Sequence, residues 1–270
     1  KMVPHLMIAE TFTRSLKGMW GLASDEDPEL GKVQDLSRIS FIGYLSHLRR
    51  VNMPLDRSIK ITSPHKLHCN QYGIMCPFET PDGASVGYLK NLAFLTKIAA
   101  GTGISNIQSC LTDINVIPIE DYQSPYDKNL GKVFINGSLY GITRYPYHIT
   151  RTLKAYRRNN LINILTSISW NIKSNEIRIL TEAGRPSRPL IIAKQVDKLK
   201  DAHNWFDLIV GSSLTLTDEE KSDELYYKDQ YINPRTIFKS LSDDEILAKL
   251  EENSAVVEFL DVEESDTCYI

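Results

Sequence analysis

The sequence lacks the features of a membrane-spanning or disulfide-bonded protein. No run of about 18 apolar residues predicts a membrane span, and the first residues have neither the long apolar centre nor the small-residue cleavage site of a secretory signal. The four cysteines in 270 residues are too few and too scattered for a disulfide framework. We therefore predict reduced thiols and an intracellular protein.

The motifs of a self-sufficient enzyme are also lacking. The chain has no Gly-rich phosphate loop, no nucleophile elbow, no zinc-helix motif and no C-x-x-C pair. His65 and His68 have no further ligands at suitable spacing, so we predict no zinc in this segment. The carboxylates at Asp113 and Glu120 lack the spacing of a two-metal site and are interpreted as surface. If the protein takes part in catalysis, the metal and its ligands come from elsewhere.

A net charge of −3 conceals two parts of opposite sign. Residues 1–200 contain 26 Lys and Arg against 16 Asp and Glu, a formal charge of +10, whereas residues 201–270 contain 5 against 18, a formal charge of −13. A basic body suits a polyanion and an acidic segment repels one, so nucleic acid should meet the first part. The acidic part is interpreted as a solubilising face.

Hydrophobic periodicity predicts an α+β protein with segregated elements. Residues 11–50 are predicted to be mostly helical around a loop at 22–32, with an amphipathic helix that starts at Ser37 and ends in Arg49-Arg50. Residues 89–100 predict one buried element, because their apolar content rises.

After Thr102 the pattern changes to short strands and short helices. Asn136-Gly137 between two apolar runs is typical of a hairpin turn, and Ser242 with Glu245 forms a capping-box motif. The cations of one predicted helix, at 147–159, either face phosphates or form an ordinary solvated surface. The other predicted elements are hairpin strands at 133–135 and 139–142, strands at 176–180 and 189–193 around a turn at 183–186, a helix through Leu250 and a strand at 255–260.

A dense polar cluster lies between Ser46 and Lys90. It combines helix-terminal arginines, a basic loop, two histidines and a turn that carries carboxylates. Arginine binds phosphate through a planar fork of donors, and lysine supplies a mobile charge. The cluster therefore suits a polyphosphate or a nucleic-acid backbone. A charged surface with turn-rich loops is the alternative.

The same stretch contains long ordered strings. LSHLRR at 45–50, followed by Asn-x-Pro and by HCNQYGIMCPFETPDGASVGYLKNL at 68–92, resembles the fork region of the second-largest, beta-like subunit of multisubunit DNA-directed RNA polymerases, in their archaeal, eukaryotic and viral branch. Weaker matches at 132–144, 153–160 and 176–190 resemble the external domains of that branch. The resemblance spans roughly residues 15–262.

The resemblance implies a domain plan. Residues 1–103 would form a helical and loop-rich fork region, with fork loops near 22–35 and 53–63. Residues 104–200 would form a first external domain, β-rich with short helices, and residues 201–270 a second, acidic one.

The resemblance also implies site residues. Glu79 and Asp82 would lie near the nucleotide-addition site, although Asp82 is one methylene shorter than the family's glutamate. His65 stands where related subunits often carry arginine, which weakens phosphate attraction at neutral pH. No catalytic residue and no metal ligand is expected in this chain. The residues expected to bind nucleic acid are His47, Arg49, Arg50, Arg57, Lys60, His65 and Lys66.

The function implied is that of one component of a nucleotidyltransferase. It would shape the active-centre cleft and contact the template DNA and the RNA–DNA hybrid, with Mg held by the largest subunit, and would be inactive alone. Expected partners are the largest and other polymerase subunits, DNA, RNA and nucleoside triphosphates, with no membrane. The expected location is the nucleus, the archaeal cytoplasm or a viral factory or virion, and the chain is expected to be a fragment or a split gene product. The alternative is a non-catalytic interaction or scaffold module of a transcription complex, centred on residues 104–262.

Overall fold

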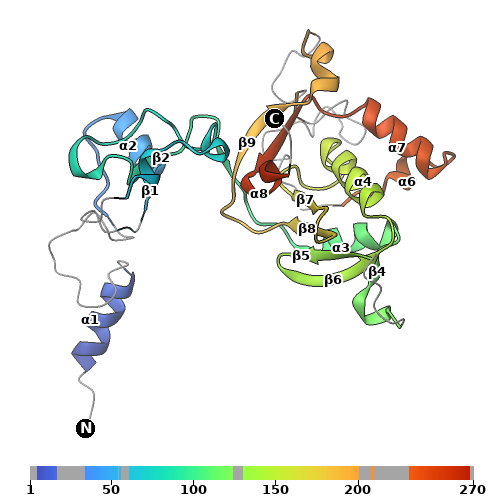
Figure 1. The fold of residues 1–270 in the computed structure, drawn as a ribbon, viewed down its shortest axis with the longest axis horizontal. Helices are drawn as coiled ribbons and strands as arrows, with labels where there is room; N and C mark the ends of the chain where they lie inside the picture. The colour runs from blue at the N-terminus through green and yellow to red at the C-terminus, as the bar shows by residue number, and fades with distance from the viewer. Residues whose placement is uncertain are drawn as a thin grey trace. The chain divides into compact units, whose positions relative to one another are not determined.

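The computed structural model describes residues 5–16, 34–53, 55, 61–123, 130–200, 208–209 and 231–267 (Figure 1). Their contacts form two compact units, Lys1–Phe94 and Leu95–Ile270, which are described separately. Helices and sheets are both present, which confirms the α+β class. The domain boundaries predicted after residues 103 and 200 stay predictions. In the described part of the chain, every helix is too short or too polar to cross a bilayer.

The first unit has little regular structure. It contains α1 (His5–Leu16), α2 (Phe41–Leu48), and a two-stranded antiparallel sheet of β1 (Arg50–Asn52) and β2 (Leu89–Asn91). Short 3-10 turns lie between the strands, at Ser63–His65, Cys69–Gln71 and Gly83–Ser85. Among its described residues, the buried large apolar side chains are Ile74, Tyr88 and Leu89.

The helix predicted from Ser37 is shorter than expected. Ser40 is its N-cap, with extended backbone and a hydroxyl that accepts a hydrogen bond from Gly43 N at 3.0 Å, so residues 34–40 are not helical. The helix ends at Leu48 because Arg50 pairs with Asn91 in the sheet. Its apolar residues are not buried in this unit, as Phe41 is 75% exposed. The predicted amphipathic helix is therefore confirmed at Phe41–Leu48, but its predicted bounds are wrong.

The single buried element predicted at 89–100 is also wrong. It divides into β2 and β3 (Lys97–Ile98), which belong to different sheets. Phe94, between them, is 94% exposed.

The second unit is built on two sheets. The larger has the order β4-β6-β5-β8-β7; β5 and β8 are parallel and the other pairs antiparallel. The smaller is antiparallel, with the order β10-β9-β3. The strands are β4 (Ile117–Pro118), β5 (Gly131–Ile135), β6 (Ser138–Thr143), β7 (Ser167–Asn171), β8 (Glu176–Leu180), β9 (Pro186–Ile191) and β10 (Val257–Asp261).

Local signals predicted the hairpin correctly. Asn136 and Gly137 both have positive φ, 48° and 82°, the backbone of the tight turn that joins β5 to β6. The strands predicted around residues 183–186 exist, but β8 and β9 lie in different sheets, and β9 ends at Ile191 rather than at 193. That turn therefore connects two sheets.

Helices cover these sheets (Figure 1). The predicted helix at 147–159 is confirmed as α4, and the capping box of Ser242 and Glu245 opens α7 as expected. Side chains of α3, α4, α7 and the larger sheet form the main hydrophobic core. The helices are α3 (Ile104–Asp113), α4 (Pro146–Arg158), α6 (Pro234–Ile237), α7 (Asp243–Glu252) and α8 (Val262–Asp266), with 3-10 segments η5 (Ile119–Asp121) and η6 (Ala193–Lys200).

The cations of α4 pair with carboxylates of the acidic part. Arg157 is 1% exposed and donates to both oxygens of the buried Glu264, at 2.6 and 2.9 Å. It also donates to Glu258, which Arg158 contacts at 2.8 Å. Arg157 is therefore neither phosphate-facing nor solvated. The interpretation of the acidic part as a solubilising face is wrong for Glu264, whose charge neutralises a buried guanidinium.

The pKa values reflect this pairing. Burial alone would raise the pKa of Glu258, but the charges of Arg157 and Arg158 outweigh burial and lower it to about 2. Burial alone would lower the pKa of Arg157, but Glu264 and Glu258 raise it above its usual value. Arg157 and Glu258 therefore both stay charged at neutral pH.

Candidate nucleic-acid interface

Glu79 is fixed to the first unit by contacts from two elements. Its carboxylate accepts a hydrogen bond from the hydroxyl of Ser46 on α2. Its backbone carbonyl accepts a bond of 3.1 Å from the side chain of Asn91, at the end of β2, and Asn91 is 3% exposed. Glu79 itself is exposed. These contacts present an anchored carboxylate to solvent, and the sequence prediction included neither Ser46 nor Asn91.

The turn that follows Glu79 is fixed in the same manner. The hydroxyl of Thr80 donates to Leu89 O and accepts from Gly87 N, each at 3.0 Å. Asp82 is exposed, and its carboxylate caps the 3-10 turn at 83–85 by accepting from Gly83 N at 3.2 Å. Its shorter side chain therefore accepts a hydrogen bond from the backbone of the next residue.

A small basic pocket lies beside this turn. Its cavity volume is about 150 Å³, and its basic lining residues are His65, Lys66 and Lys90, with no carboxylate among the described residues that line it. The ammonium of Lys90 donates to Gln71 at 3.4 Å. An unneutralised cationic pocket attracts phosphate. The sequence prediction included His65 and Lys66 but missed Lys90, although Lys90 stands within the string at 68–92.

Close packing explains the glycine at the base of this pocket. Gly87 has a φ of 75°, and a Cβ there would lie 2.8 Å from Nδ1 of His65 and 3.1 Å from Pro64 O. The ring of His65 also packs edge-on against Tyr88, with centroids 5.6 Å apart. A side chain at position 87 would therefore displace the ring of His65.

The remaining residues that were predicted to bind nucleic acid differ in how freely their side chains can contact a phosphate. His47 is half-buried; its Nδ1 accepts from Ser37 N at 3.0 Å and its Nε2 lies 3.1 Å from Gln34 Oε1. Arg49 donates to the carbonyl of Ala93 at 2.6 Å. Arg50 is exposed. Arg50 is thus the best placed of the three to meet a phosphate. Arg57 and Lys60 lie outside the described residues, as do most residues of the two expected fork loops.

The carboxylates here do not form a metal site of their own. In the described ranges, no group of three or more His, Cys, Asp or Glu is placed to hold an ion. His68 caps the 3-10 turn at Cys69–Gln71 through its Nδ1, which accepts from Asn70 N at 3.2 Å. The expectation that no zinc binds in this segment stays a prediction.

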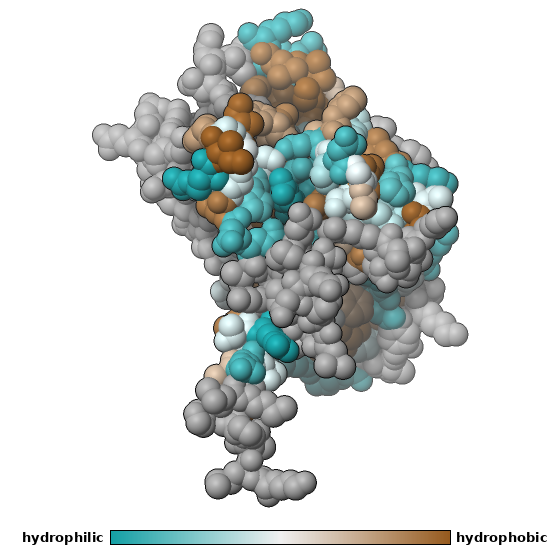
Figure 2. Space-filling model, turned by 90° about the vertical axis from the view of Figure 1, so that its left-hand side faces the viewer, coloured by the Kyte–Doolittle hydropathy of each residue, from teal (hydrophilic) through white to brown (hydrophobic). Residues whose placement is uncertain are grey.

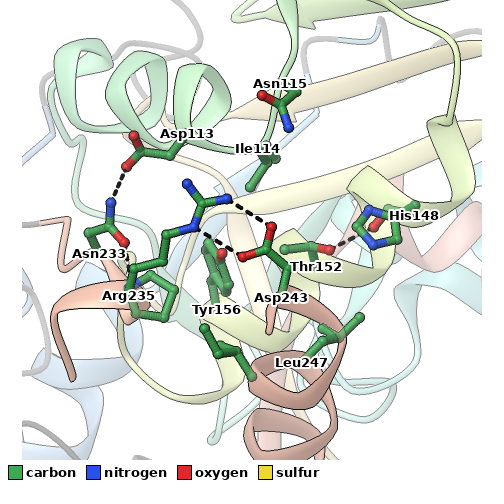
Figure 3. Close-up of a pocket in the computed structure, with 12 residues that line it drawn as sticks. Asp113, Ile114, Asn115, His148, Thr152, Tyr156, Asn233, Arg235, Asp243 and Leu247 are labelled. Atoms are coloured by element: carbon green, nitrogen blue, oxygen red, sulfur yellow. Dashed lines mark hydrogen bonds and ion pairs between the residues drawn. The ribbon is translucent and has the colours of Figure 1, made fainter. Parts of the chain in front are cut away.

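A second cavity, in the other unit, is less suited to binding (Figure 3). Its volume is about 70 Å³, and α3, α4, α6 and α7 surround it. Arg235 makes two bonds to Asp243, at 2.8 and 3.0 Å, and Asp113 accepts from Asn233 at 2.7 Å and from Tyr231 at 2.8 Å. Arg235 and Asp243 neutralise each other and Asp113 is held by two neutral donors, so the cavity is interpreted as a packing feature that fixes α6 against its neighbours.

Large apolar side chains remain exposed in the first unit. On the face in Figure 2, hydrophobic atoms reach the surface among hydrophilic ones. Exposed apolar surface of this extent indicates contact with other protein. The most exposed of these side chains are Ile39, Phe41, Ile42, Phe78 and Phe94, between 75% and 97% exposed.

Comparison with family models gives two matches. Residues 34–98 match RNA polymerase Rpb2, domain 3, and residues 133–194 match RNA polymerase Rpb2, domain 4. The first match contains every residue of the candidate interface described above.

Curated relatives cover most of the chain. It is 34% identical over 242 residues to the DNA-directed RNA polymerase II subunit RPB2 of Schizosaccharomyces pombe, covering 89% of this chain and 19% of the relative. It is 32% identical over 234 residues to the Arabidopsis thaliana RNA polymerase II subunit 2, covering 80% and 20%. It is 31% identical over 218 residues to Rpo2 of Saccharolobus shibatae, covering 73% and 19%. The chain thus spans about a fifth of the length of these relatives.

Proposed function

Because this chain belongs to the RNA polymerase Rpb2 family, through its matches to domains 3 and 4, we propose that it is a component of a DNA-dependent RNA polymerase that shapes the active-centre cleft. It contacts template DNA and the RNA–DNA hybrid through the first unit, while the assembled enzyme performs RNA synthesis. The observation that carries the proposal is the basic pocket beside the anchored carboxylate of Glu79, all within residues 34–98.

The pocket supplies phosphate contacts. Lys66 and Lys90 line the pocket with cationic side chains, His65 adds ring nitrogens, and Arg50, outside the lining, is a further exposed cation. Cations without a neighbouring carboxylate in the pocket lining bind a polyanion without first breaking an ion pair. We infer that the pocket contacts the nucleic-acid backbone or the phosphates of an incoming nucleoside triphosphate.

Glu79 supplies a fixed acceptor. Because Ser46 and Asn91 already hold its carboxylate and its backbone, it meets a ligand with little further loss of side-chain entropy. Asp82 stays near its own turn. Among the residues that the structure describes, neither carboxylate has the partners of a metal site. We propose that Mg, which supplies the Lewis acid for nucleotidyl transfer, is held by the largest subunit and not by these residues.

The proposed partners are the largest and other polymerase subunits. The relatives are named as subunits of DNA-directed RNA polymerases, and the exposed apolar side chains of the first unit support contact with further protein. The proposed location is where such an enzyme works: the nucleus, an archaeal cytoplasm or a viral factory. The comparisons do not favour a pure interaction or scaffold module.

Salt dependence of binding tests the nucleic-acid contact. The 270-residue chain should bind a labelled RNA–DNA hybrid with an affinity that falls steeply with salt, because each phosphate contact releases counterions. Lys66→Ala and Lys90→Ala should each reduce the slope of the logarithm of affinity against the logarithm of salt concentration by about 1. Lys239→Ala removes an exposed lysine of the other unit and should leave the slope unchanged. A slope equal to that of the unaltered chain in both pocket variants would exclude this pocket as a phosphate site.

Elongation by the assembled polymerase tests the role in the cleft. Arg50→Ala and Glu79→Gln should slow transcript extension, whereas Glu120→Gln, at an exposed carboxylate of the other unit, should not. Arg49 is a poor test position because its guanidinium bonds the carbonyl of Ala93, so its removal disturbs the fold. Normal extension by both variants would argue against the proposed role.

A further inference from the structure

A large groove lies in the second unit, separate from the candidate interface. Its cavity volume is about 790 Å³, within the range of sites that enclose a ligand or a short peptide. Residues of α4, η6, α7, β10 and the ends of β7 and β9 line it, and all belong to Leu95–Ile270.

One wall of the groove is apolar. Leu190, Ile192 and Leu260 contribute to it, together with Ile191, 56% exposed, and Ile172, 72% exposed. Branched side chains that stay exposed beside a groove gain free energy when a partner covers them.

Aromatic rings extend this wall. Trp170 and Tyr147 both line the groove, with ring centroids 6.3 Å apart. The indole nitrogen of Trp170 is buried and has no hydrogen-bond partner among the described residues. Because this nitrogen is the one polar atom of the side chain and is buried, the part of Trp170 that lines the groove is apolar.

The groove is positively charged overall. Its lining contains four cations and two carboxylates, Glu251 and Glu258. Arg151 and Arg158 each pair with one of these, and Lys154 lies 3.2 Å from Glu264 outside the lining. Lys194 is exposed and makes no ion pair with any described carboxylate. The lining therefore has two more cations than carboxylates, and Lys194 is the one of these cations without an ion pair to a described carboxylate.

We propose that this groove binds a peptide segment of a partner protein in which acidic and apolar side chains alternate. In an extended peptide, successive side chains point to opposite sides, so one set covers the apolar wall while the other meets the cations. A nucleic-acid backbone carries a phosphate at every nucleotide and would leave the apolar wall uncovered, whereas an alternating peptide complements both the wall and the cations. Protein is therefore favoured over nucleic acid as the occupant.

Binding of defined probes to the 270-residue chain tests this. The main probe is a fluorescein-labelled peptide of about eight alternating aspartate and leucine residues. Its binding is measured by fluorescence anisotropy. It should bind at least about tenfold more tightly than an aspartate–serine peptide or a lysine–leucine peptide of similar length, and an oligothymidylate should not displace it. Displacement of the bound peptide by the oligothymidylate, or equal binding of the aspartate–serine peptide, would overturn the proposal.

Substitutions in the chain show where the peptide probe binds. Lys194→Glu and Ile172→Asp, both at exposed positions where the fold tolerates change, should each weaken binding about tenfold. Lys239→Glu makes the same charge change outside the groove, and Lys66→Glu makes it in the basic pocket of the first unit; both should leave the affinity unchanged. Loss of binding in Lys66→Glu alone would assign the probe to that pocket and refute the groove. Hybrid binding by the first unit is a separate measurement, so either proposal can fail without the other.

Discussion

The two units of this chain are stabilised by different means. In the second, two hydrophobic clusters and a buried network of Arg157, Glu258 and Glu264 hold helices and sheets together. In the first, short 3-10 turns and side-chain bonds to the backbone fix the chain, and large apolar side chains such as Phe41 and Phe78 are left exposed. The second unit contains its own core, whereas the described residues of the first unit bury few large apolar side chains. A substitution at a buried position of the second unit should therefore lower the free energy of unfolding more than a similar substitution at an exposed position of the first unit.

Removing a buried charge should give the largest effect. Glu264→Gln leaves the guanidinium of Arg157 without its main counter-charge in a site that is 1% exposed, and breaking such a pair costs about 3–5 kcal/mol. Glu263→Gln changes the neighbouring residue, whose partner Arg178 is largely exposed, and should cost under about 1 kcal/mol. Urea denaturation followed by circular dichroism measures both, and equal losses would contradict the distinction between buried and exposed pairs.

A matched pair of leucines compares the two units directly. Leu250→Ala removes a side chain with 0% exposure from the main core of the second unit and should lower the free energy of unfolding by about 2–5 kcal/mol. Leu48→Ala changes a 59% exposed leucine of α2 and should alter it by no more than about 0.5 kcal/mol. If the isolated chain loses as much stability from the second variant, the first unit has a core of its own.

Acid should weaken the second unit through Glu258. Its folded-state pKa of about 2 lies below its ordinary value of 4.5. The stabilisation is therefore fully present above pH 4.5 and is lost as the pH falls towards 2, with a magnitude of up to about 3 kcal/mol. Glu258→Gln should be less stable at neutral pH and should depend less on pH over this range. If the free energy of unfolding of the unaltered chain and of Glu258→Gln changes equally with pH, other carboxylates account for the pH dependence.

A pair of glycines gives the smallest expected effect, in the first unit. Gly87→Ala and Gly83→Ala both place a side chain at positive φ, 75° and 81°, which costs about 1 kcal/mol. Only the Cβ at residue 87 also approaches His65 and Pro64 O. We therefore expect Gly87→Ala to be the more destabilising variant and to weaken hybrid binding as His65 moves. Thermal denaturation and the salt-dependent binding assay measure the two consequences.

Local signals predicted local structure. Asn136-Gly137 predicted a hairpin because few residues other than Asn and Gly adopt positive φ in consecutive positions. Ser242 and Glu245 predicted the start of α7 because the two side chains satisfy helix-terminal donors within one turn. In the candidate interface, the string at 68–92 pointed to Glu79 and Asp82 through a resemblance. It did not predict that Ser46 and Asn91 fix Glu79, because these contacts join residues 33 and 12 positions apart.

The sequence by itself determined the α+β class, the hairpin, the capped helix and the strings that resemble a polymerase subunit. Only the tertiary structure decided which charges remain for a ligand. Arg157 and Lys66 both appear in the sequence as basic residues, yet one is buried against Glu264, 107 positions away, and the other lines an open basic pocket. The physical reason is that a charge's availability depends on counter-charges and burial, which long-range packing fixes and sequence spacing does not.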